Sequence, residues 1–398
     1  MSEMVPKVRF QGFTDDWEER KLGELVEQII REVPKPNKPY YRMSVRSHAK
    51  GTFKQFVDNP ENVAMDKLFV VKKDDLVVNI TFAWEHAIAV VNEENDGLLV
   101  SHRFPTYRAD GKSDIEFLHH VVSKENFRRK LEFISPGGAG RNRVLNKKDF
   151  LKLKIFVPKI EEQQKIGSFF KQLDNTIALH QRKLDLLKEQ KKAFLQKMFP
   201  KNGARVPELR FAGFADDWEE RKLKDIAQFN PKTVLPDEFE YVDLESVVGT
   251  EMISHRTESK DQAPSRAQRL AQKGDVFYQT VRPYQMNNYL YDLPYDNYVF
   301  STGYAQMRPN IDSYFLLNSV QNKQFVQHVL DRSTGTSYPA INSSDLSNIE
   351  IHVPSKLSEQ QKIGAFFQSI DDTIALYQRK LELLKEQKKG FLQKMFVS

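Results

Sequence analysis

Residues 162–199 read EQQKIGSFFKQLDNTIALHQRKLDLLKEQKKAFLQKMF, and residues 359–396 repeat this segment as EQQKIGAFFQSIDDTIALYQRKLELLKEQKKGFLQKMF. Thirty of the 38 aligned positions are identical, and the two copies lie 197 residues apart. This distance is much longer than the repeat unit of a solenoid. The repeat therefore indicates a duplicated domain together with its connector.

A second, shorter repeat opens each half of the chain. VPKVRFQGFTDDWEERKL at residues 5–22 recurs as VPELRFAGFADDWEERKL at residues 206–223, with 14 of 18 positions identical. The inserts between the repeats, residues 23–161 and 224–358, are almost unrelated in sequence. Similar edges around dissimilar inserts predict a common scaffold that carries two different recognition modules.

The long repeat has the periodicity of a coiled-coil helix. Apolar residues recur at alternating intervals of four and three, which is a heptad seam. Proline is absent from both copies, while Pro158 and Pro354 stand just upstream, where a helix can begin. A helix of this length rises about 57 Å. The seam residues are Ile166, Phe170, Leu173, Ile177, Leu184 and Leu187 in the first copy, and Ile363, Phe367, Ile370, Ile374, Leu381 and Leu384 in the second.

A single helix of this length cannot bury its apolar seam alone. Because both copies carry the same seam, we expect them to pack against each other within one chain. An antiparallel pair would relate the two halves by a pseudo-twofold axis and hold their inserts at opposite ends. A coiled coil between two chains is the alternative.

The inserts are expected to mix strands and helices. Strand patterns occur at residues 76–81, 87–91, 98–100, 152–157, 275–281, 298–301 and 349–353. One helical pattern spans residues 114–134, and its counterpart spans 313–332. The predicted class is α+β, with two mixed α/β domains joined by an antiparallel intramolecular coiled coil.

Composition narrows the classes of protein. The 398 residues contain no cysteine, which excludes disulfides and thiolate chemistry and fits a reducing cytoplasm. No apolar stretch approaches the roughly 20 residues that span a bilayer, and we expect neither a signal peptide nor a membrane partner. The net charge of +6 permits a polyanionic partner without requiring one.

Polar loops supply candidate contacts to nucleic acid. Cationic side chains suit phosphates, and arginine and amide side chains match the edges of guanine and adenine. The candidates in the first half are Arg42, Arg46, His48, Lys50, Lys54, Arg141, Asn142 and Arg143. Those in the second half are Arg282, Tyr284, Gln285, Asn287, Asn288, Thr334, Thr336, Ser337 and Tyr338. Ordinary polar turns are the alternative for these loops, and Trp84, His102 and Arg103 are weaker candidates.

Catalytic motifs are missing from the sequence. There is no phosphate-binding loop of the ATPase kind, no GxGxxG after a strand, no Asn-Pro-Pro-aromatic tetrad and no HExxH. We therefore expect a binding protein with no catalytic residues and no metal site. Two alternatives remain: a nuclease or methyltransferase in its own right, and a coiled-coil scaffold that ignores DNA. Incubation with S-adenosylmethionine or magnesium tests the first, and the salt dependence of DNA binding tests the second.

The chain resembles the specificity subunit of type I restriction-modification enzymes. The resemblance covers essentially the full length and rests on four segments in order: GFTDDWEERKL, FVPKIEEQQKIGSFF, GFADDWEERKL and HVPSKLSEQQKIGAFF. It implies target-recognition domains at residues 1–157 and 201–354, a central conserved helix at 158–200 and a distal one at 355–398.

The same resemblance implies a role in host defence. Each recognition domain would bind one half of a bipartite double-stranded DNA sequence. The helices would bind two modification subunits, and restriction subunits would complete the complex. This chain would bind no cofactor itself, since S-adenosylmethionine, ATP and Mg²⁺ would belong to the partners.

Replacing Arg141 or Arg143 by alanine is expected to impair recognition of one half-site and leave the other intact, because each insert would read one half. Binding to targets altered in either half measures this. Equal loss of affinity across unrelated sequences would identify these arginines as phosphate contacts instead.

Overall fold

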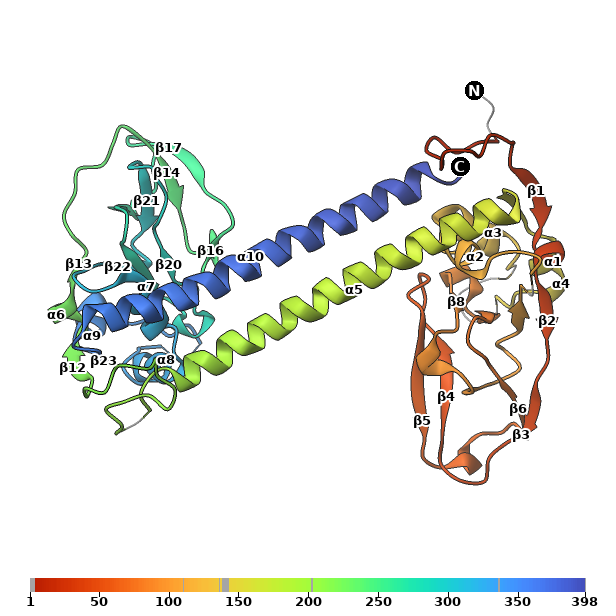
Figure 1. Cartoon of the computed structure of the whole chain (residues 1–398), viewed down its shortest axis with the longest axis horizontal. Coiled ribbons are helices and arrows are strands. Elements are labelled where there is room, and N and C mark those ends of the chain that lie inside the picture. The colour runs from red at the N-terminus through yellow and green to blue at the C-terminus, as the bar shows by residue number, and fades with distance from the viewer. Residues whose placement is uncertain are drawn as a thin grey trace. The chain divides into compact units, whose positions relative to one another are not determined.

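The computed structural model describes residues 4–109, 111–135, 137, 143–201, 203–335 and 337–397. The chain forms two compact units (Figure 1): unit 1 is Met1–His180 with Lys380–Ser398, and unit 2 is Gln181–Arg379. Each unit combines one insert with one end of each long helix. The units therefore cut across the four segments inferred from sequence, whose boundaries stay predictions.

Within the described residues, three sheets and four short helices form the insert of unit 1 together with the end of its opening repeat. Strand β1 (Glu18–Lys21) pairs antiparallel with β11 (Lys154–Val157). A four-stranded sheet has the order β2 (Glu27–Ile29), β10 (Thr106–Arg108), β7 (Leu76–Val78), β8 (Ile88–Val90). A five-stranded sheet has the order β3 (Glu32–Pro34), β6 (Lys67–Val70), β9 (Leu99–Val100), β4 (Tyr40–Val45), β5 (Thr52–Val57). The helices are α1 (Leu22–Leu25), α2 (Ile115–Val122), α3 (Glu125–Phe133) and α4 (Lys147–Lys152).

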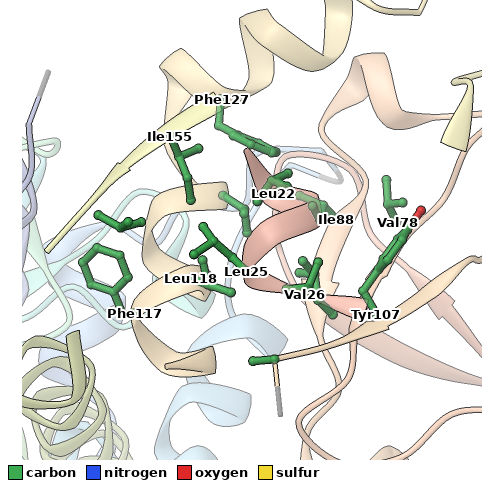
Figure 2. Close-up of a cluster of buried hydrophobic side chains, with 14 of the residues drawn as sticks. Leu22, Leu25, Val26, Val78, Ile88, Tyr107, Phe117, Leu118, Phe127 and Ile155 are labelled. Atoms are coloured by element: carbon green, nitrogen blue, oxygen red, sulfur yellow. The ribbon is translucent and has the colours of Figure 1, made fainter. Parts of the chain in front are cut away.

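The core of this insert lies between the four-stranded sheet and the helices (Figure 2). Tyr107 on β10 is fully buried beside Val78 on β7, and Phe117 reaches the cluster from α2. Strands β7 and β8 are apolar throughout because one face of this antiparallel sheet packs in this core, while Val77 and Ala89 on the other face pack in a second buried cluster. The helices α2 and α3 thus fix the edge of the sheet to the long helices.

Unit 2 repeats this plan with different sheets. Strand β12 (Glu219–Lys222) pairs with β23 (Glu350–Val353). One four-stranded sheet has the order β13 (Ala227–Phe229), β22 (Tyr304–Pro309), β19 (Val276–Gln279), β20 (Tyr289–Leu290). The other has the order β17 (Arg256–Ser259), β14 (Glu238–Val242), β21 (Tyr298–Ser301), β18 (Ala267–Leu270), and β15 (Val247–Val248) pairs with β16 (Glu251–Met252). The helices are α6 (Leu223–Ile226), α7 (Ser313–Val320), α8 (Lys323–Asp331) and α9 (Ser343–Ser347).

The predicted strands are confirmed, but the single helix expected at 114–134 is wrong. The structure has two helices there, α2 and α3, and likewise α7 and α8 in unit 2. The apolar stripe explains the break. Leu118 and Val122 are buried on α2, and a continuous helix would next bury positions 125 and 129, whereas Phe127 and Leu131 are the buried residues. The chain must turn before residue 125 to bury both stripes.

The long helices α5 (Ile160–Lys197) and α10 (Leu357–Lys394) each contain 38 residues. In unit 1 the rings of Phe169 and Phe391 are 5.2 Å apart, and Lys388 pairs with Asp174. Numbers rise along α5 as they fall along α10, so the helices of one chain pair antiparallel. Eight of the twelve seam residues are buried, and Leu173, Ile177, Ile370 and Leu384 are half-buried.

Unit 2 makes the same helix contacts with the partners exchanged. Phe194 packs on Phe366 at 5.0 Å, and Lys191 pairs with Asp371 at 2.6 Å. Each of these residues lies 197 positions from its counterpart in unit 1. The intramolecular coiled coil predicted from the seam is therefore present in each unit. None of the helices in the described ranges is both long and apolar enough to cross a membrane.

The residues just after each long helix enter a domain core. Phe396 follows α10 and packs against Trp17 and Phe117 in unit 1, with ring distances of 6.2 and 5.5 Å. Phe199 follows α5 and packs against Trp218 and Phe315 in unit 2, at 6.1 and 5.7 Å. The core of each unit is therefore completed by the end of a long helix that starts in the other unit.

A glycine marks the place where each long helix crosses the insert. A Cβ on Gly167 would lie 2.9 Å from the backbone nitrogen of Phe117 and would collide with Oδ1 of Asp114. That oxygen caps α2 by accepting a hydrogen bond from the same nitrogen at 2.8 Å. Gly364 meets the cap residue Asp312 of α7 in the same way. The close approach therefore leaves no room for a side chain.

Gly167→Ala is expected to destabilise the protein by about 1–3 kcal/mol, because overpacking outweighs the gain of about 1 kcal/mol in helix propensity. Gly390→Ala is the matched control. Among the described residues, no atom outside the helix's own neighbouring backbone lies within 4 Å of a Cβ built at Gly390, and Ala193 holds the equivalent position in α5. This control should gain up to about 1 kcal/mol. Urea unfolding measures both, and stabilisation by both variants would contradict a tight crossing.

Buried histidines distinguish unit 1 from unit 2. His120 on α2 is 6% exposed, and its ring lies 4.7 Å from that of Phe170. Burial lowers the pKa of His120 to about 3 and also lowers the pKa of His119. The matching positions on α7 are Leu317 and Asn318, which do not titrate.

The free energy of unfolding should fall at acid pH because of His120. Its pKa is lower in the folded chain than in the unfolded chain, so the unfolded chain binds the proton more tightly. The stability is complete above about pH 6.5 and decreases below it, by about 2 kcal/mol at about pH 5. His120→Asn should remove this component in urea titrations, whereas His102→Asn at an exposed position should not. An unchanged pH profile in His120→Asn would refute the assignment.

Candidate nucleic-acid interface

The β4–β5 hairpin gathers the cationic candidates of unit 1. Arg42, Arg46, His48, Lys50 and Lys54 are all exposed on this hairpin or its turn. Arg42 faces its cross-strand partner Gln55 and donates from Nε to Oε1 at 3.0 Å. Lys54 instead pairs with Met43, so it points to the opposite face of the hairpin. The structure therefore brings the five residues into one segment but divides them between two faces.

A cavity of about 430 Å³ lies beside the face that carries Arg42. Its polar lining includes Tyr40, Asn79, His102 and Arg103. His102 and Arg103 are therefore stronger candidates than the sequence alone indicated, because they line the same cavity as Arg42. Asn79 was missed because it lies inside the strand pattern predicted at residues 76–81, whereas the observed strand β7 ends at Val78 and leaves Asn79 just beyond it.

A turn and a downstream loop meet at the second candidate surface of unit 1. The turn is the single-turn helix η2 (Ala83–Glu85), and the loop ends before α4. The guanidinium of Arg143 lies 5.4 Å from the ring centroid of Trp84 on η2. Arg143 also donates to the carbonyl of Gly137 at 3.3 Å and lies 3.8 Å from Glu132. Arg141 and Asn142 lie outside the described residues.

In unit 2 the corresponding turn and loop also meet, but the arginine and the aromatic ring have exchanged places. Here the arginine is on the turn: Arg282 precedes η4 (Pro283–Gln285), and its guanidinium lies 4.5 Å from the ring centroid of Tyr338 on the downstream loop. The backbone nitrogen of Arg282 donates to the carbonyl of Pro339 at 2.8 Å. Tyr284, Thr334, Ser337 and Tyr338 are exposed around this pair, and Thr336 lies outside the described residues.

The amide candidates of unit 2 make hydrogen bonds within the protein. Asn288 is buried, and its Oδ1 accepts a hydrogen bond from the backbone nitrogen of Gln279 at 2.8 Å. Asn287 Oδ1 accepts from the backbone nitrogen of Gly249 at 2.8 Å. Gln279 donates from Nε2 to Gln285 Oε1 at 2.9 Å. Sequence reasoning missed Gln279, although an amide closing the apolar strand β19 was the available signal.

Two buried amide atoms near this turn lack partners among the described residues: Oε1 of Gln279 and Nδ2 of Asn288. Beside the turn lies a cavity of about 360 Å³. Its cationic lining consists of Lys188, Lys191 and Lys192 from α5 and Lys323 from α8, next to Gln285 and Met286. Within the part of the chain that the structure describes, no cluster of three acidic or histidine side chains could hold a metal ion.

Comparison with known proteins identifies relatives across the chain. The family model for the type I restriction modification DNA specificity domain matches residues 14–189 and 215–386. The HindI specificity subunit of Haemophilus influenzae is 25% identical over 196 residues, which cover 46% of this chain and 41% of that relative. In this match the chain spans less than half of the relative's length.

Two further matches extend over nearly the whole chain. The MjaVIII specificity subunit of Methanocaldococcus jannaschii is 23% identical over 404 residues, covering 95% of this chain and 91% of the relative. The solved S subunit of a type I restriction-modification system from M. genitalium has a TM-score of 0.61 at 14% identity and 99% coverage of both chains. This last likeness shows a shared fold.

Proposed function

The chain belongs to the family of type I restriction modification DNA specificity domains, and on that premise we propose that it reads a bipartite DNA target, one half-site per insert. The observation that supports this most strongly is the pair of turn-and-loop surfaces. Both occupy the same place in their inserts, and both are held by an arginine on an aromatic ring. Their other residues differ, as two different half-sites would require.

Each half-site would be bound by two kinds of contact. Exposed cations such as Arg42, Arg46 and Lys54 suit phosphates, which fix the register of a protein on the duplex. The turn-and-loop residues suit base edges, because they present guanidinium, amide and hydroxyl groups from loops that the sheets and helices of the insert hold in position.

We further propose that the long helices hold the partners of this subunit. Residues 182–183 and 189–190 of α5 and their repeats in α10 present the same exposed side chains. Identical surfaces suit two identical modification subunits. Restriction subunits would complete the assembly in the cytoplasm. S-adenosylmethionine, ATP and Mg²⁺ would act in these partners, and this chain would contribute recognition without catalysis.

Exchange of residues 224–353 for the second insert of another family member should change one half of the target and leave the other unchanged. The repeated segments at both edges of the insert supply the same core contacts, so the chimera should fold. Mapping of methylated adenines in DNA from cells that carry the chimera and its partners measures the outcome. The unmodified chain is the control, and a change in both half-sites would argue against independent inserts.

A further inference from the structure

We propose that Arg282 reads a guanine in the half-site bound by unit 2. This inference rests on the proposed DNA recognition and assigns one base contact within it. The side chain belongs to the turn before η4, and it is half-buried between this turn and the loop that carries Tyr338.

The guanidinium of Arg282 is oriented by an aromatic ring and has no carboxylate partner among the described residues. It lies 4.5 Å from the ring centroid of Tyr338, and its Nε is shielded from solvent with no acceptor in the described ranges. Two other half-buried arginines of this unit are paired, Arg308 with Asp275 at 2.8 Å and Arg210 with Glu359 at 2.6 Å. Arg269 on β18, by contrast, also has a buried Nε with no partner among the described residues. A guanidinium that is held by a ring and has no carboxylate partner in the described ranges keeps its Nη donors available for an acceptor from outside, whereas the buried Nε would not take part.

The backbone at this turn is held in an uncommon conformation. Arg282 has φ 56° and ψ 55°, and Met286 at the other end of η4 has φ 57°. These left-handed values are unfavourable for side chains larger than glycine. Two hydrogen bonds maintain them: Arg282 N to Pro339 O at 2.8 Å, and Gln285 N to Arg282 O at 3.0 Å. Such strained positions concentrate at binding sites, where they fix a side chain in place.

The surroundings separate this arginine from a phosphate contact. The lysine-lined cavity lies on the α5 side of the turn and is bounded by Gln285 and Met286, whereas Arg282 stacks toward the downstream loop. In this arrangement the phosphates of the duplex would contact the lysines of the cavity. The guanidinium stacked on Tyr338 would then face the major groove. The two donors of a guanidinium edge match the O6 and N7 acceptors of guanine in the major groove. Lysine offers one compact charge and does not reproduce that pairing.

Among the described residues of unit 1, the matching arginine, Arg143, is not presented in the same way. Arg143 makes the matching ring contact, but it also donates to Gly137 O and lies near Glu132. Its fork is therefore partly occupied inside the protein. The assignment of a guanine contact is restricted to Arg282.

The test is a binding selection with the full-length chain, purified with its partner subunits, on duplexes with one half-site randomised at a time. The wild type should prefer guanine at one position of the unit 2 half-site. In Arg282→Lys that preference should fall by roughly 5- to 150-fold while the other positions keep their preferences. Tyr338→Ala, at an exposed loop position, should weaken the same position because the guanidinium loses its support.

Lys323→Gln is the matched control from the lysine-lined cavity. It should weaken binding to all sequences alike and reduce the slope of log affinity against log salt by about 1. An unchanged base profile in both Arg282→Lys and Tyr338→Ala, or loss of a preference for another base, would overturn the guanine assignment alone. A wild-type chain that selects no sequence in either half would instead overturn the proposed function.

Discussion

Each recognition core depends on the antiparallel packing of α5 against α10. The apolar residues that follow one helix, Phe396 in unit 1 and Phe199 in unit 2, fill a space between a tryptophan and a phenylalanine of the insert. Burying a ring of this size contributes about 2–3 kcal/mol. An insert without both helix ends would expose that space to water. The duplication is thus a requirement of packing within each unit as well as a route to two recognition modules.

A buried ion pair fixes the start of each long helix to the opening repeat. Glu162 is 1% exposed and accepts two hydrogen bonds from the guanidinium of Arg9, both at 2.7 Å. Glu359 accepts the same pair from Arg210 and a further bond from the indole of Trp218 at 3.3 Å. Removing either member would leave a charge in a low-dielectric site, which is costly. This contact accounts for the arginine that both short repeats share, Arg9 and Arg210.

Periodicity predicted the long helices well because their packing depends on the regular spacing of apolar residues. The heptad seam located both long helices to within two residues, and the strand patterns located strands such as β7 and β19 but missed the buried strands β10 and β22. The single helix expected at residues 114–134 was wrong because the shift of the apolar stripe between Val122 and Phe127 was overlooked. The candidate surfaces were harder to predict. Whether Asn288 faces solvent or accepts from the strand that holds Gln279 depends on tertiary packing that no local pattern records.

Because the arginine and the aromatic ring are exchanged between the two units, only some recombinants of the two inserts would keep this contact. In unit 1 the turn supplies the aromatic residue Trp84 and the downstream loop supplies Arg143; in unit 2 the turn supplies Arg282 and the loop supplies Tyr338. A recombinant that joined the turn of one insert to the loop of the other would place either two cations or two aromatic rings at this junction. Genetic exchange should therefore succeed where crossovers fall in the repeats and fail where they separate a turn from its own loop.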